Sequence, residues 1–165
     1  MSVSISMEDL LAWNEESALL WKGWLEANPA ALELPCGIGG AATVQDFVRH
    51  IWGVELRWAE RLQGGPETPK EALPTGPVEA LYDLHRRAAV IYQKLLAGPG
   101  ENWEEPYTLN ASWLPAEKRT CTRRKILAHA LLHSPRHWAQ LATLVRSAGL
   151  PSGINGDLLF SSAVR

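Results

Sequence analysis

The sequence predicts an all-α fold, a bundle of four helices joined by long loops. Three observations support this prediction. Four segments repeat apolar residues every three or four positions, which is the period of a helix with one buried face. Clusters of proline and glycine separate these segments. No stretch alternates apolar and polar residues for long enough to predict a sheet.

The first helix is expected over residues 7–26. Ser6 is a plausible N-cap, and Glu8 and Asp9 suit the positive end of the helix dipole. The residue before a proline is biased away from helical conformation, so Pro29 ends this helix. Its apolar surface is formed by Leu10, Leu11, Trp13, Leu20, Trp21, Trp24 and Leu25.

The second helix is expected over residues 43–64 and the third over residues 77–97. Thr43 is a good N-cap for the second helix, and Pro77 suits the first position of the third. Sequences of glycine and proline end both helices. The second apolar stripe is Val44, Phe47, Val48, Ile51, Val54, Trp58 and Leu62, and the third is Val78, Leu81, Tyr82, His85, Ala88, Ala89, Tyr92 and Leu95.

The fourth helix is expected over residues 122–148, with Gly149 as the residue that follows its C-cap. Residues 101–120 form a loop that is long for a compact domain, and such loops are often functional. Long connections between helices indicate a bundle with crossover connections.

The composition indicates one globular domain, residues 1–165, with no repeat or composition shift that marks a second. A net charge of -2 argues against a nucleic-acid partner, which would require a basic patch. No segment has the roughly 18 apolar residues of a membrane span, and the N-terminus lacks signal-peptide features. Cys36 and Cys121 have no partner motif and fit a reducing compartment. We therefore expect a cytoplasmic protein without membrane partners.

Eight tryptophans are unusual for a chain of 165 residues. Tryptophan has a large apolar body, so a tightly packed bundle explains the number best, and an aromatic-lined pocket is the alternative. We expect Trp21 or Trp24, Trp58 and Trp138 to be largely buried, in the core or in a dimer interface.

Three of the five histidines, His129, His133 and His137, fall within nine residues of the fourth helix. Helical residues four apart lie one above the other on the same face. At about 100° per residue, His133 and His137 lie in the middle of the core stripe and His129 lies at its edge. Buried imidazoles require partners for their nitrogens, and one metal ion is a partner for both. We predict a metal site over the alternative of two hydrogen-bonded core histidines.

Pro135 lies between these two histidines and removes one backbone hydrogen bond. The apolar stripe continues in phase across it, which favours one kinked helix. The alternative is a new helix with Ser134 as its N-cap, which would place His133 outside that helix.

A catalytic zinc site usually has three protein ligands and one open position. His85 lies within the apolar face of the third helix, and His50 lies at the margin of the second. The projection slightly favours His85, but a residue at the margin can point between two helices, so His50 stays a candidate. Glu55, one turn beyond His50, is the best candidate for a general base or a supporting carboxylate. A surface carboxylate is the alternative for Glu55.

At these residues the sequence resembles the DinB-like family, which includes the bacillithiol and mycothiol S-transferases and proteins described as metal-dependent hydrolases. The family has one histidine in an apolar, aromatic-containing run of the second helix, here FVRHIWGVELRW over residues 47–58. A histidine pair spaced by three residues, then Gln-Leu and a closing glycine, follows in the fourth helix. Here these residues are HALLHSPRHWAQL over 129–141, with Gly149. Arg136, Ala139 and Pro135 depart from this family pattern; these departures leave the histidines intact and are expected to bear on the shape of the pocket and hence on the substrate.

The resemblance covers essentially the whole chain and implies His50, His133 and His137 as a metal triad. It also implies an up-down-down-up order of the helices and, often, a homodimer. Zinc or nickel is the expected ion, although imidazole also suits iron and copper.

Three hypotheses for the function follow. The first is a metal-dependent enzyme that transfers a low-molecular-weight thiol or hydrolyses a small-molecule substrate, as the resemblance implies. The second is a non-catalytic bundle that binds a metal or a ligand with the same histidines. The third is a structural dimer without metal.

Overall fold

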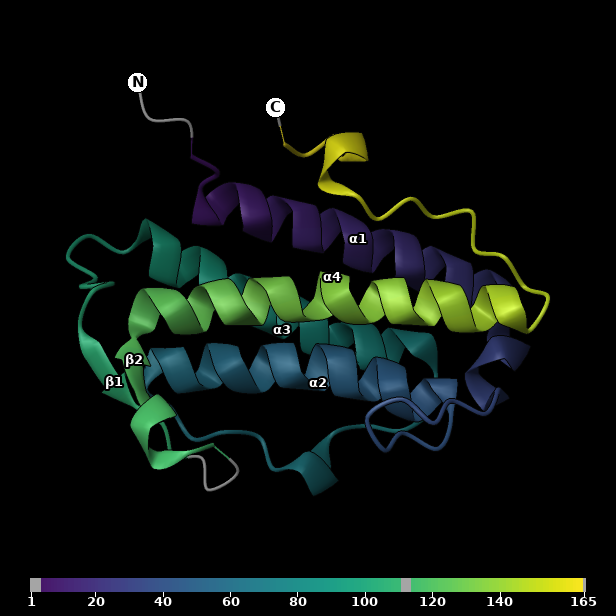
Figure 1. Ribbon diagram of the computed structural model, residues 1–165, viewed down its shortest axis with the longest axis horizontal. Coiled ribbons are helices and arrows are strands. Elements are labelled where there is room, and N and C mark those ends of the chain that lie inside the picture. The colour runs from purple at the N-terminus through teal and green to yellow at the C-terminus, as the bar shows by residue number, and fades with distance from the viewer. Residues whose placement is uncertain (1–3, 111–113, 165) are drawn as a thin grey trace.

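The computed structural model describes residues 4–110 and 114–164. Its four long helices are α1 (Met7–Ala27), α2 (Val44–Gln63), α3 (Val78–Ala97) and α4 (Arg123–Ser147) (Figure 1). Each helix begins and ends within one residue of the expected bounds, so the prediction of an all-α four-helix bundle is confirmed.

Side-chain caps explain where the helices begin. The Ser6 hydroxyl accepts from the Asp9 amide at 2.9 Å, and the Ser6 amide donates to the Asp9 carboxylate at 3.1 Å. Thr43 and Asp46 form the same reciprocal pair at the start of α2. These contacts satisfy amides that have no partner within the helix. Gly64 ends α2 in the left-handed conformation, with φ of 80°.

Each helix packs against two others. Both α1 and α2 contact α3 and α4. The chain runs in one direction along α1 and α4 and in the opposite direction along α2 and α3 (Figure 1). Because α2 and α3 run the same way, the connection over residues 64–77 returns along the outside of the bundle (Figure 1). The Leu73 side chain of this connection lies over Gly53, where a Cβ atom would be 2.5 Å from Leu73 Cδ1.

Tryptophans occupy the centre of the bundle, as the sequence predicts. The exposed fractions of Trp21, Trp58 and Trp138 are 2%, 7% and 3%. The Trp138 ring stacks on Trp21, with 5.3 Å between centroids, and meets Trp52 edge-on at 5.4 Å. These contacts join α1, α2 and α4, and buried aromatic pairs of this kind stabilise a core beyond the area they bury.

Short elements lie in the connections. Strands β1 (Pro106–Thr108) and β2 (Thr120–Thr122) form an antiparallel pair at the end of the bundle where α4 begins (Figure 1). The connections and the C-terminal tail also contain 3-10 helices, which are η1 (Pro29–Glu33), η2 (Lys70–Ala72), η3 (Ala116–Lys118) and η4 (Leu158–Phe160). Within the described residues, no helix has the length and apolar character needed to cross a membrane.

The α4 helix continues through Pro135, as the phase of the apolar stripe predicts. The alternative of a new helix capped by Ser134 is wrong, because Ser134 is a buried residue of the helix interior. His133 and His137 therefore lie one turn apart on the same continuous helix.

Candidate metal centre

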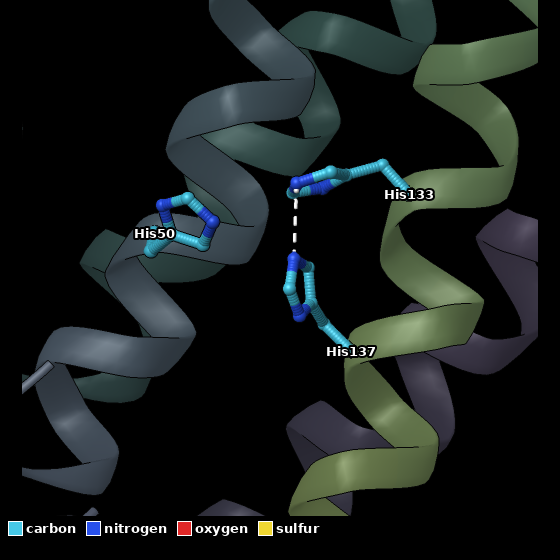
Figure 2. A group of neighbouring side chains, drawn as sticks. All are labelled: His50, His133 and His137. Atoms are coloured by element: carbon cyan, nitrogen blue, oxygen red, sulfur yellow. Dashed lines mark hydrogen bonds between the residues drawn. The ribbon is translucent and has the colours of Figure 1, made fainter. Parts of the chain in front are cut away.

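The imidazole rings of His50, His133 and His137 come together between α2 and α4. Figure 2 shows His133 and His137 pointing from α4 toward α2, one above the other, with His50 beside them on α2. Their candidate ligand nitrogens all lie within 4.8 Å of one another. The structure thus brings together the three histidines that the resemblance implies.

The spacing of the rings fits one bound ion. The Nε2 atoms of His133 and His137 are 3.1 Å apart. Two nitrogens bound to zinc at tetrahedral angles are separated by about 3.3 Å, given bonds of roughly 2.0–2.1 Å. The His50 ring centroid lies 5.3 Å from that of His133 and 5.2 Å from that of His137. Three imidazoles without a carboxylate form a donor set that suits zinc, nickel, copper or iron.

Gln140 fixes the orientation of one ligand. His137 Nδ1 lies 2.6 Å from Gln140 Oε1. An amide oxygen only accepts, so Nδ1 carries the proton and Nε2 keeps its lone pair for a metal. His133 Nδ1, in contrast, is buried and has no hydrogen-bond partner among the described residues. The described residues therefore provide a hydrogen-bond partner for Nδ1 of His137 but none for Nδ1 of His133.

The environment of the rings favours their neutral form. Burial, together with the nearby charges of His137 and His50 when these are protonated, lowers the pKa of His133 to about 3. Burial is also the main cause of the lowered pKa of His50 and of His137. Neutral imidazoles offer lone pairs at pH 7, so protons compete weakly with a metal ion here.

The other two candidate histidines lie outside this group. His85, the rival third ligand, is buried in the face of α3, but its Nδ1 lies 2.7 Å from Glu55 Oε2. The His129 ring contacts Trp58 and His133, at centroid distances of 5.4 and 5.9 Å. Neither residue belongs to the group that could hold an ion.

Glu55 lies in the interior of the bundle, and its exposed fraction of 1% rules out the alternative of a surface carboxylate. Its Oε1 accepts from Asn14 Nδ2 at 2.8 Å and from the Ser134 hydroxyl, and its Oε2 faces His85. Its backbone carbonyl accepts from the Tyr92 hydroxyl at 2.8 Å. A general base must reach a reacting proton, and both carboxylate oxygens here contact protein groups. This geometry favours a positioning role.

A cavity of about 200 Å³ opens beside His50 and His133. Its wall includes the metal-ligand candidates His50 and His133, together with Trp58 and two arginines, Arg57 and Arg61. A site with three protein ligands has an open coordination position. A small molecule in this cavity would lie against two of the three candidate ligands.

Sequence reasoning missed the supporting residues of this site. In the sequence, Gln140 belongs to the family pattern, and its contact with His137 follows from the three-residue spacing on one helix. Asn14 and Ser134 are polar residues at buried positions of α1 and α4. Their interruption of the apolar faces is the available signal, but their common partner Glu55 is visible only once the helices are packed.

Comparison with known proteins agrees with this arrangement. The family model of the DinB family matches residues 1–161. A search of curated proteins finds no match. The family match covers nearly the whole chain and includes both helices that carry the histidines, so this chain belongs to the DinB family.

Proposed function

We propose that the protein is a metal-dependent enzyme that transfers a low-molecular-weight thiol to a small electrophilic substrate. The observation that carries the proposal is the group of three imidazoles, held between two helices with one side open to a cavity. A divalent ion bound there would act as a Lewis acid and would lower the pKa of a thiol or water in its open position. Zinc or nickel is the ion we expect.

The residues of the chain have distinct roles in this proposal. His50, His133 and His137 hold the ion, and Gln140 keeps His137 in the required tautomer. In the reaction the thiol loses its proton to solvent, its sulfur bonds to an electrophilic carbon, and the leaving group departs with the electron pair of the broken bond. The cavity beside the histidines positions the two reactants.

Hydrolysis of a small molecule is the second candidate reaction. Base-assisted attack by water requires a carboxylate or another base near the water. Glu55, the predicted general base, already contacts Asn14, Ser134 and His85. This engagement favours thiol transfer, and we assign Glu55 the role of positioning Ser134, the neighbour of His133.

The proposal extends to compartment and assembly. A cytoplasmic location suits an enzyme that uses a pool of reduced thiols, and Cys36 and Cys121 are both free. A homodimer would cover the exposed leucines Leu19, Leu20 and Leu132 on α1 and α4.

Metal analysis of untagged protein tests the proposal. We expect about one divalent ion per chain, loss of this ion in His137→Ala, and its retention in the control His129→Ala, which removes a histidine one turn before His133. In cobalt-substituted protein, a thiol should produce a thiolate-to-metal absorption band. A native protein without stoichiometric metal would overturn the proposal. Metal binding without a thiolate band or turnover would favour the non-catalytic bundle.

A further inference from the structure

A row of basic side chains follows α2 beside His50. Arg49, Arg57 and Arg61 are separated by multiples of four residues, so they lie on one side of the helix. Gly53 occupies the position of this row between Arg49 and Arg57, so no side chain stands between the two arginines there. Lys70 of the 64–77 connection lies near the same row, because the Arg49 guanidinium donates to the Lys70 carbonyl at 2.8 Å.

These side chains line two cavities that share a wall. A cavity of about 290 Å³ is lined by Arg49, Arg57, Lys70 and His50 on one side and by the glycine-rich residues 38–42 on the other. The smaller cavity beside the metal-ligand candidates is also lined by Arg57 and His50. A molecule in the larger cavity would therefore lie against His50, one of the three proposed metal ligands.

The positive charge around these cavities is only partly neutralised. Arg57 and Arg61 share one carboxylate, that of Glu67, at 3.2 and 2.6 Å. Arg49 and Lys70 have no carboxylate partner among the described residues. Lys70 and His50 line the same cavity, which places this positive charge close to the metal-ligand candidates.

Asp46 is the acidic residue in the wall of the larger cavity, and it already caps α2 through Thr43. The Nε groups of Arg49 and Arg57 are buried and have no acceptor among the described residues. Buried donors without a partner cost free energy, and an anionic ligand supplies both the missing acceptors and the missing charge.

We infer that the thiol carries an anionic group, a carboxylate, that Arg49 and Arg57 bind while its sulfur reaches the three histidines. The inference rests on the proposed function, because it names the class of thiol that this site would bind. The planar guanidinium group matches the two oxygens of a carboxylate. The larger cavity is of the size that holds a small molecule.

Two thiols that differ only in charge test this inference. The probes are 3-mercaptopropionate and its neutral analogue 3-mercaptopropionamide, titrated into cobalt-substituted protein. We expect the carboxylate to bind at least about tenfold more tightly, as charged hydrogen bonds predict. The ratio of the two dissociation constants should fall toward one in Arg49→Gln and in the Arg49→Gln/Arg57→Gln double variant. The metal content of both variants should stay unchanged. Arg86→Gln, an exposed arginine on α3, is the matched control and should keep the preference.

The outcomes separate the inference from the proposed function. Equal binding of both thiols, or a preference that survives in the double variant, overturns the inference and leaves the proposed function standing. Calorimetry of inorganic phosphate binding to metal-free protein tests the anion site without a thiol or a metal. If no thiolate band appears but phosphate binds and both arginine variants lose this binding, the anion site stands and the proposed function falls. Arg49→Gln breaks no ion pair, so it reports on binding even if the double variant folds poorly.

Discussion

His133 is the candidate metal ligand whose protonation the fold controls most strongly. Its ring lies 5.3 Å from that of His50 and 4.3 Å from that of His137, and burial is the main cause that lowers its pKa to about 3 from the ordinary value of 6.5. The folded protein therefore keeps this ring neutral at a pH where the unfolded chain binds a proton. Any state that binds more protons gains stability as the pH falls, so here acid favours the unfolded state.

The metal-free protein should become less stable between pH 7 and pH 5. The unfolded chain takes up a proton at residue 133 as the pH falls through 6.5, while the folded protein does so only near pH 3. We expect this residue to lower the free energy of unfolding by about 1–2 kcal/mol over that interval. Urea denaturation at the two pH values measures the effect. His133→Gln should lose less stability, and an identical loss in both proteins would contradict the assignment.

Helix α4 carries two of the candidate metal ligands together with the group that orients one of them. Gln140 lies three residues after His137, so the same helical turn holds both partners of the hydrogen bond. The α4 half of the site thus depends on the helix alone, while His50 requires the packing of α2 against α4.

Gln140→Leu should weaken metal binding by about 10- to 100-fold, because loss of such a partner releases the ligand ring and its tautomer. Competition with a chelator measures the affinity of the zinc-loaded variant. Gln93→Leu, on the exposed side of α3, removes a comparable amide and should leave the affinity unchanged. Equal affinities of native protein and Gln140→Leu would show that this hydrogen bond does not support the site.

The sequence predicted these elements unevenly, for physical reasons. Helix ends follow from local caps such as Ser6 and Thr43, and the His133–His137 pair follows from helical spacing, so both could be predicted. The third ligand could not be predicted from periodicity, which slightly favoured His85, because the central position of His85 serves a hydrogen bond to Glu55. Strands β1 and β2 have three residues each, too few to show an alternating pattern.

At the scale of the whole molecule, Glu55 connects all four helices. Its carboxylate contacts Asn14 of α1, His85 of α3 and Ser134 of α4 from its own position on α2. We propose that this shared contact makes the chain a single domain that unfolds as one unit.

Glu55→Leu should lower the free energy of unfolding by about 3 kcal/mol, because it leaves several buried polar groups without their common acceptor. Urea denaturation, followed by circular dichroism and by tryptophan fluorescence, measures the loss and tests for a single transition. Glu26→Leu removes an exposed ion pair with Lys22 and should change stability by less than about 1 kcal/mol. A similar loss of unfolding free energy in the two variants would contradict the proposed role of Glu55 in joining the helices.

The connection over residues 64–77 has a consequence for how this protein can evolve. It contributes Lys70 and Leu73 to the wall of the larger cavity, while the three histidines come from α2 and α4. On the proposed function, mutations in this segment would alter which molecules the cavity accepts and would leave the three histidines unchanged. Selection would then act on substrate choice and on ion binding separately, and a lineage could acquire a new substrate through changes in one surface segment.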